Sequence, residues 1–127
     1  MKNNLRVTYT LHPNIVNIIN HFSEYYNLSK SKFVSLCIEY GFEFMEEELE
    51  EFKGGGYDDF YKGSKKINDT QPTTLTLPKD LLERLNYYST ELGVKKSHLV
   101  NGSVYLIYED IQQKLSDDID DLMKSVE

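Results

Sequence analysis

Two short stretches of the chain, beginning at Arg6 and at Pro72, alternate between residues suited to a buried position and residues suited to a solvent-facing one. Alternation with a period of two, in β-branched and aromatic residues, is typical of a strand with one buried face. The predicted buried face carries Val7, Tyr9 and Leu11 in the first strand and Thr73, Leu75 and Leu77 in the second. The predicted open face carries Arg6, Thr8 and Thr10 in the first strand and Pro72, Thr74 and Thr76 in the second.

Each predicted strand leads into a predicted helix. The strands stop at Pro13 and Pro78, and proline is favourable in the first turn of a helix because its missing N–H would be unpaired there. Asn27 and Gly93, which tolerate a left-handed backbone, indicate where these helices end. Apolar residues recur between those limits at helical spacing, namely Ile15, Ile19, Phe22 and Tyr26 in the first helix and Leu81, Leu85, Tyr88 and Leu92 in the second.

A further helix is predicted to begin at Ser29 in the first half of the chain and at Lys95 in the second half. The first of these runs through Phe33, Leu36, Cys37, Tyr40 and Phe44, and the second through Leu99, Ser103, Leu106 and Ile107. The acidic tail from Asp110 to Glu127 also has apolar residues at helical spacing, namely Ile111, Leu115, Ile119, Leu122 and Val126. The tail is therefore expected either to continue the last helix or to form a short additional amphipathic helix.

The two halves of the chain are copies of one unit. Shifted by sixty-six positions, residues 6–42 align with residues 72–108 without a gap. Identical residues coincide at eight positions, which are Thr8, Thr10, Leu11, Asn20, Ser23, Lys30, Ser31 and Val34 in the first copy. An internal repeat of this length indicates a duplicated supersecondary unit, here strand, helix, helix. Each copy is too short to bury its own apolar face, so the copies are expected to pack on each other.

This pattern divides the chain into three parts. Residues 1–53 form the first repeat, residues 54–71 form a flexible linker rich in glycine, lysine and aspartate, and residues 72–127 form the second repeat with its acidic helical tail. With 127 residues, of which 39% are hydrophobic, the chain is long enough for one domain or for two small ones that share a core.

Net charge at first argues against a nucleic-acid partner. The chain carries −7 overall, and phosphate neutralisation supplies much of the affinity of most DNA-binding proteins. The charge is uneven, however. Residues 1–41 have four basic and two acidic side chains and residues 71–108 have four and three, whereas residues 42–70 and 109–127 each carry a net −5. A nucleic-acid surface would therefore be confined to the repeated units.

Catalytic, metal and cofactor chemistry is not indicated. The single cysteine, Cys37, falls on a predicted buried stripe, and the three histidines, His12, His21 and His98, lack metal-ligand spacing. No nucleophile–base set or phosphate-binding loop is recognisable, so neither enzyme activity nor a small-molecule substrate is expected.

The chain has no apolar amino-terminal run, so a cytoplasmic or other reducing intracellular location without membrane insertion is expected. The ten tyrosines are expected to fall largely at core or helix-edge positions.

Two motifs, at the start and in the middle of the repeated unit, resemble those of the ribbon-helix-helix superfamily of the Arc, MetJ and CopG type. These are Thr-x-Thr before the first helix and, in the first copy, Leu28-Ser29-Lys30-Ser31 at the start of the second helix. The resemblance covers both repeats, about two thirds of the chain. It implies a mostly α fold with a two-stranded antiparallel β-ribbon, here as a tandem pseudo-dimer within one chain. It also implies that the ribbon enters the major groove of double-stranded DNA.

The resemblance also implies roles for individual residues. The base-reading residues would be Arg6, Thr8, Thr10, Thr74 and Thr76. The phosphate-binding residues would be Ser29, Lys30, Ser31, Lys32, Lys95, Lys96, Ser97 and His98. The chemistry of these residues favours the same roles, because arginine and threonine can contact base edges. Lysines in the first turn of a helix oppose the helix dipole, which a nearby phosphate would compensate.

Pro72 departs from the family pattern, since a long polar side chain is expected where it stands. Proline donates no hydrogen bond to a base, so we predict unequal half-sites, with the first repeat reading its half more strictly. Simpler interpretations remain open: strand threonines are often only good β-formers, and surface lysines are often only solvated.

The functional hypothesis is a sequence-specific transcriptional regulator of the repressor type. Its partners would be an operator in double-stranded DNA and further copies of the chain, as a homo-dimer or higher oligomer. One alternative is the antitoxin of a toxin–antitoxin pair, whose acidic tail wraps a basic toxin. Another is a protein-interaction module that has lost DNA binding. Richness in tyrosine, isoleucine, lysine and asparagine is compatible with a virus or plasmid of an AT-rich or archaeal host.

Overall fold

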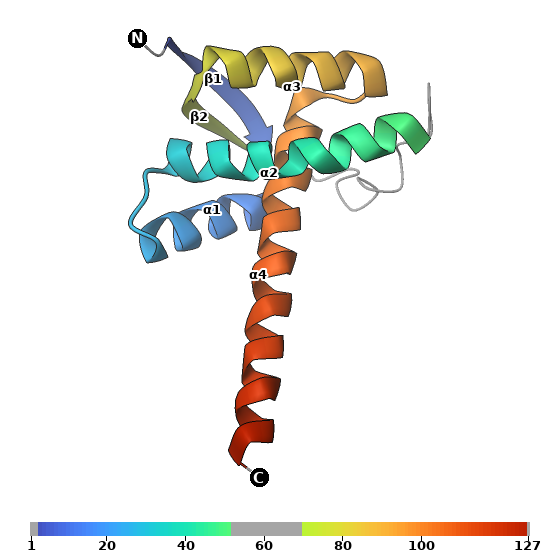
Figure 1. The fold of residues 1–127 in the computed structure, drawn as a ribbon. Coiled ribbons are helices and arrows are strands. Elements are labelled where there is room, and N and C mark those ends of the chain that lie inside the picture. The colour runs from blue at the N-terminus through green and yellow to red at the C-terminus, as the bar shows by residue number, and fades with distance from the viewer. Residues whose placement is uncertain (1–2, 52–69, 127) are drawn as a thin grey trace.

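The structure is a computed structural model that describes residues 3–51 and 70–126. The expected linker over residues 54–71 therefore lies outside the described residues, apart from Thr70 and Gln71. In chain order the elements are β1 (Asn4–Leu11), α1 (Pro13–Tyr25), α2 (Lys30–Glu51), β2 (Gln71–Pro78), α3 (Lys79–Leu92) and α4 (Lys96–Val126). The order strand, helix, helix thus occurs twice, and the described part is mostly helical with a two-stranded sheet (Figure 1).

The two strands pair antiparallel although 59 residues separate the end of β1 from the start of β2 in the sequence. Thr8 lies opposite Thr74, and their Oγ1 atoms are 2.9 Å apart in a hydrogen bond across the ribbon. Arg6 lies opposite Thr76, so the open faces of both strands point to the same side of the ribbon. The two-stranded antiparallel ribbon expected from the sequence is confirmed.

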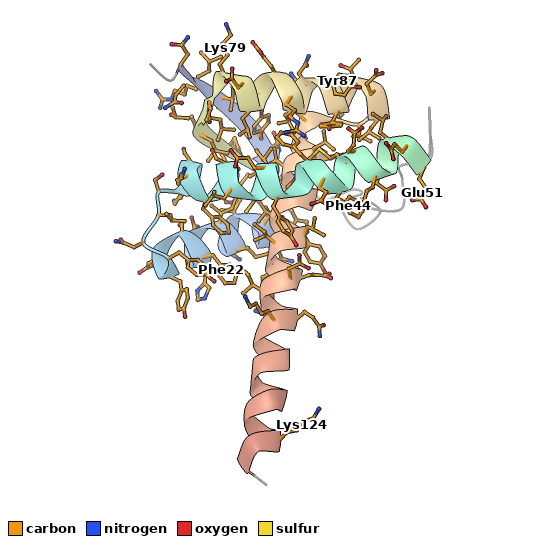
Figure 2. The ribbon with its side chains drawn as sticks, in the orientation of Figure 1. Phe22, Phe44, Glu51, Lys79, Tyr87 and Lys124 are labelled. Atoms are coloured by element: carbon orange, nitrogen blue, oxygen red, sulfur yellow. The ribbon has the colours of Figure 1, made fainter. Side chains whose placement is uncertain are left out.

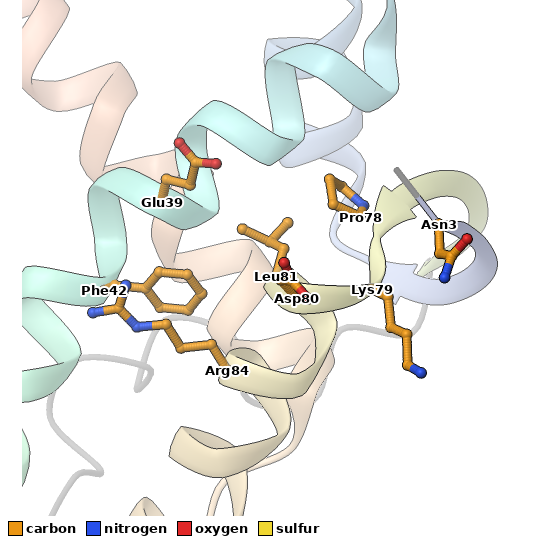
Figure 3. Close-up of a pocket in the computed structure, with 8 residues that line it drawn as sticks. All are labelled: Asn3, Glu39, Phe42, Pro78, Lys79, Asp80, Leu81 and Arg84. Carbon is orange, nitrogen blue, oxygen red and sulfur yellow. The ribbon is translucent and has the colours of Figure 1, made fainter. Parts of the chain in front are cut away.

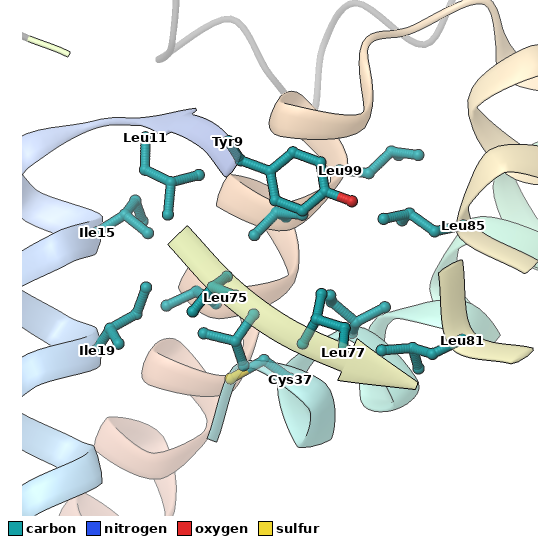
Figure 4. Close-up of a cluster of buried hydrophobic side chains, with 14 of the residues drawn as sticks. Tyr9, Leu11, Ile15, Ile19, Cys37, Leu75, Leu77, Leu81, Leu85 and Leu99 are labelled. Atoms are coloured by element: carbon teal, nitrogen blue, oxygen red, sulfur yellow. The ribbon is translucent and has the colours of Figure 1, made fainter. Parts of the chain in front are cut away.

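The inner face of the ribbon lies on one hydrophobic core to which all four helices contribute (Figure 4). Leu11, Leu75 and Leu77 are almost completely buried, as the alternating pattern predicts, because the helices cover this face. Val7 and Thr73 are only partly buried. The core also takes Ile15 and Ile19 from α1, Cys37 from α2, Leu81 and Leu85 from α3, and Leu99 from α4.

The helix boundaries follow local capping chemistry, with one difference from the prediction. Pro13 is the first residue of α1, and the Nδ1 atom of His12 caps this helix by accepting from the backbone N–H of Asn14 at 2.9 Å. Pro78, by contrast, is the last residue of β2 and the N-cap of α3, not a residue of its first turn. Its fixed φ suits the extended cap conformation, with φ −60° and ψ 141°.

The left-handed positions that end the first helix of each copy are also where the sequence places them. Asn27 has φ 58° and Gly93 has φ 70°. The long helix α4 runs without interruption to Val126, so the acidic tail continues the last helix and is not a separate one. The carboxyl-terminal part of α4 projects beyond all other described elements (Figure 1).

The buried stripe of α2 differs from the run expected for it. Leu36 and Tyr40 are 39% and 48% exposed. The buried residues are Phe33, Val34, Ser35, Cys37, Ile38, Gly41, Phe42 and Met45. The stripe is turned toward α3 and α4, the helices against which α2 packs most extensively, and the sequence alone does not say where those neighbours lie.

The helices α2 and α4 lie close together at Gly41. A Cβ atom placed on Gly41 would collide with Oγ of Ser103, whose own hydroxyl donates to the carbonyl of Leu99 at 2.8 Å. Glycine in a helix interior costs about 1 kcal/mol relative to alanine. Here it allows the backbones of the two helices to cross closely, which brings the copies together around one core.

A polar contact between the copies supplies a first test of this packing. The backbone N–H of His12 donates to Oδ1 of Asn101, a buried residue of α4, at 3.2 Å. In the repeat alignment, Pro78 and Ser35 take the places of His12 and Asn101, and proline has no N–H to donate. We expect Asn101→Ala to lower the free energy of unfolding by about 1 kcal/mol, because a partly buried N–H loses its acceptor.

Urea denaturation followed by circular dichroism measures this loss. The matched control is Ser35→Ala, which removes a buried hydroxyl at the equivalent place on α2 and should change the free energy of unfolding by less than about 0.5 kcal/mol. A larger loss for Ser35→Ala than for Asn101→Ala would contradict the assigned contact.

Within the described residues, none of the helices combines the length and the apolar character that crossing a membrane requires.

Candidate nucleic-acid interface

The outer face of the ribbon carries every residue that the sequence analysis assigned to base reading. All five are exposed and lie on the same side, in two adjacent rows: Arg6, Thr8 and Thr10 on β1 and Thr74 and Thr76 on β2. The strand also begins earlier than predicted, so Asn4 extends the same exposed row by one position. Sequence reasoning missed Asn4, although carrying the alternation back by two residues would have found it.

The electrostatic character of this face differs from that of the whole chain. Neither β1 nor β2 contains an acidic residue, and the first turns of α2 and α4 contain none. The chain as a whole has 21 acidic residues against 14 basic ones. The ribbon and the amino ends of the two long helices thus form a region without negative side chains.

The amino end of α2 is fixed beside one end of the ribbon. Ser29 precedes the helix, and its Oγ accepts from the backbone N–H of Lys32 at 3.1 Å. The Oγ of Ser31 accepts from the backbone N–H of Thr76 at 2.9 Å, which ties the first turn of α2 directly to β2. Lys30 and Lys32 are exposed in that turn. The helix begins one residue later than predicted, so Ser29 acts as a cap.

The amino end of α4 lies near the other end of the ribbon. The contact of Asn101 with His12 joins the second turn of α4 to the residue that follows β1. Lys95, just before the helix, and Lys96, its first residue, are exposed, whereas Ser97 and His98 are partly buried. Burial, and then the nearby positive charge of Lys95, lower the pKa of His98 below its usual value.

The structure therefore brings the proposed phosphate-binding residues to both ends of the ribbon, but the two ends are chemically different. At one end Arg6 lies opposite Thr76, next to the first turn of α2. At the other end Thr10 lies opposite Pro72. Two hydrogen-bonding side chains are thus side by side at the first end, and one is present at the second.

A shallow groove of about 580 Å³ lies between the start of α3 and the middle of α2 (Figure 3). Its lining carries both charge signs, with Glu39 and Asp80 as acidic residues and Lys79 and Arg84 as basic residues. The guanidinium of Arg84 lies 4.4 Å from the centre of the Phe42 ring. The groove is lined by Asn3, Glu39, Phe42, Pro78, Lys79, Asp80, Leu81 and Arg84, a set that contains no cysteine, serine, threonine or histidine.

Cys37 and the possible metal-ligating side chains were compared with what reactive thiols and metal sites require. Burial raises the pKa of the Cys37 thiol to about 12, so the thiolate needed for a nucleophile does not form near neutral pH. Among the described residues, no three histidine, cysteine, aspartate or glutamate side chains lie close enough to hold a metal ion.

Comparison of the chain with protein-family models, with curated protein sequences and with solved structures finds no match.

Proposed function

We propose that the chain is a sequence-specific regulator that binds double-stranded DNA with the outer face of its ribbon in the major groove. The observation that carries this proposal is the combination of an exposed, acid-free ribbon face with a lysine-bearing helix start at each of its ends. A two-stranded ribbon fits the width of the major groove. Backbone N–H groups at helix starts can bind the flanking phosphates.

In this proposal the two repeats form a ribbon-helix-helix pseudo-dimer. The strand register supports it, because Thr8 and Thr74 are equivalent in the repeat and are also cross-strand partners. A two-fold axis through that pair relates Thr10 to Thr76 and Arg6 to Pro72. The proposed reading face therefore has two-fold symmetry in its backbone, but its side chains break that symmetry, since Arg6 is equivalent to Pro72.

Such an interface binds an operator in one preferred orientation. Arg6 makes a bidentate contact with a guanine in the half-site that also receives the first turn of α2. The half-site under Thr10 and Pro72 is held mainly through phosphates by the start of α4. The operator is accordingly a short, imperfect palindrome, and repression follows from occupying it.

Binding-site selection from random duplex DNA, followed by a salt titration on the selected site, tests the proposal. We expect one enriched sequence, in which one half shows strong base preferences and the other half shows weak ones. The logarithm of the association constant should fall linearly with the logarithm of the salt concentration, since bound phosphates release counterions. No enrichment, together with no binding to random duplex at low salt, would refute the proposal and favour a protein-interaction module.

The antitoxin alternative has one observation in its favour, the projection of α4 beyond the rest of the molecule (Figure 1). Residues 109–127 carry two basic and seven acidic side chains, a composition suited to a basic partner. Co-expression with the protein encoded next to this chain separates the two functions. A stable complex that neutralises a toxic neighbour identifies an antitoxin.

A further inference from the structure

His12 continues the outer row of the ribbon by one position beyond Thr10. Its backbone is extended, with φ −64° and ψ 140°, and the residue before it, Leu11, is completely buried on the inner face. Successive side chains of an extended chain point to opposite sides, so the side chain of His12 lies on the same side of the ribbon as that of Thr10. The residue is partly exposed there.

The imidazole of His12 is held in one orientation by the cap of α1. Its Nδ1 atom accepts from the backbone N–H of Asn14 at 2.9 Å. A ring nitrogen that accepts a hydrogen bond carries no proton, so the ring is neutral in this conformation and its proton is on Nε2. The backbone N–H of His12 is also engaged, by Oδ1 of Asn101. Among the described residues, none accepts a hydrogen bond from Nε2 of His12.

The charges around His12 favour an anionic ligand. The bond to Asn101 joins it to the second turn of α4, and the exposed lysines Lys95 and Lys96 stand at the start of that helix. Acidic residues are absent from β1, from β2 and from the first turns of α1 and α4. An N–H donor close to two cations and to the positive ends of two helix dipoles suits an oxygen of a phosphate group.

The second copy of the repeat has no counterpart of this side chain. Pro78 is equivalent to His12 and comes directly before Lys79, the first residue of α3, which is labelled in Figure 2. Pro78 makes no side-chain hydrogen bond to the helix it precedes, so the fold forms this junction without one. Where a cap is present, serine, aspartate or asparagine serves better than histidine. Capping alone therefore does not account for a histidine here, and its distal N–H is the group that those residues lack.

We propose that His12 is a further DNA-contacting residue, whose Nε2–H donates to a phosphate oxygen in the half-site under Thr10 and Pro72. This contact rests on the proposed function and deepens it, because it adds a donor at the end of the ribbon where Thr10 lies opposite a proline. A phosphate fits better than a base, since His12 lies past the end of β1 and is tied to the helix whose start carries Lys95 and Lys96.

Two substitutions of His12 separate the DNA contact from the helix cap. His12→Asn keeps an acceptor oxygen near the position of Nδ1 but has no group at the position of Nε2. His12→Gln instead places an amide N–H near the position of Nε2 and is a poor cap. On the operator selected with the native chain, we expect His12→Asn to lower the affinity about tenfold and to keep the native stability toward urea. His12→Gln should keep most of the affinity and unfold at a lower urea concentration.

Two further measurements identify the bound group as a phosphate. Ethylation interference on the selected operator should show one phosphate fewer for His12→Asn than for the native chain, in the half with weak base preferences. A neutral donor releases no counterion, so the salt dependence of His12→Asn should match that of the native chain, whereas Lys96→Ala should reduce its slope by about 1. The matched control is His21→Asn, the same replacement at an exposed histidine of α1, and it should leave the affinity unchanged.

Each contrary outcome has a distinct meaning. Native affinity in His12→Asn would overturn the inference and leave the proposed function standing. Equal losses of affinity in His12→Asn and His12→Gln would also overturn it, since the ring would then act only through the cap of α1. A changed base preference without a lost phosphate contact would place Nε2 on a base and overturn the assignment to phosphate. A native chain that binds no DNA would refute the proposed function, and the contact of His12 with it.

Discussion

Replacing Leu77 by alanine is expected to lower the free energy of unfolding by about 2–5 kcal/mol. Leu77 is completely buried on the inner face of β2, in the core cluster that joins the ribbon to the helices. Its removal takes apolar contacts away and leaves a cavity that a two-stranded sheet, held in place by its own core, can fill only partly. Urea denaturation with a fluorescence or circular dichroism readout gives the difference between the variant and the native chain.

The cross-strand partner of Leu77 is a matched control of the same residue type. Leu5 lies opposite Leu77 in the ribbon, on the same inner side, but it is 46% exposed at the end of β1. Leu5→Ala should cost less than about 1 kcal/mol, since roughly half of the side chain is already in water. Equal losses for the two substitutions would show that the helices cover the ribbon evenly to its end, contrary to the burial described here.

Local patterns in the sequence were sufficient to predict the elements and the outer face of the ribbon. Period-two alternation depends only on strand geometry, so it placed Thr8 and Thr74 on the open face and Leu75 on the closed face correctly. Asn27 and Gly93 marked helix ends because left-handed backbone is a local property of those residue types. Each of these patterns also occurs at the equivalent position of the other repeat, which makes the prediction from it more specific.

Features that depend on contacts between distant residues could not be predicted in the same way. The exposed side of α2, with Leu36 and Tyr40, is set by where α3 and α4 lie, and helical spacing alone fits more than one side. The hydrogen bond from the backbone N–H of Thr76 to Oγ of Ser31 joins residues 45 positions apart, and no pattern in the sequence predicts it. That contact matters for the candidate site because it sets which helix start lies beside Arg6.

The site itself therefore divides into two parts. The outer face of the ribbon, proposed here to read bases, follows from alternation and could be predicted from the sequence, whereas the difference between its two ends depends on the register and the tertiary contacts. The register pairs Arg6 with Thr76 and Thr10 with Pro72, and the contact of Ser31 adds the start of α2 to the first of these pairs. The two ends of the ribbon thus differ in their side chains, whereas the unequal half-sites predicted from Pro72 stay a prediction until binding to DNA is measured.

Arg6→Ala is expected to remove discrimination at one base pair of the operator, worth about 1–3 kcal/mol, and to leave the other half-site unchanged. Arg6 is exposed on the outer face of β1, where a guanidinium can reach both acceptors of a guanine. Quantitative binding to the selected operator, and to operators with a single substitution in either half, measures the loss and its position.

The control is Arg84, the only other arginine of the chain. Arg84 belongs to α3, not to the ribbon, and its guanidinium lies over the ring of Phe42 on α2. Arg84→Ala removes the same charge, so a general electrostatic effect would lower the affinity of both variants equally for every sequence. A role in base reading instead confines the loss to Arg6→Ala and to one half-site. If Arg6→Ala weakened both halves equally, the two ends of the ribbon would be equivalent on DNA, and the oriented interface proposed here would be wrong.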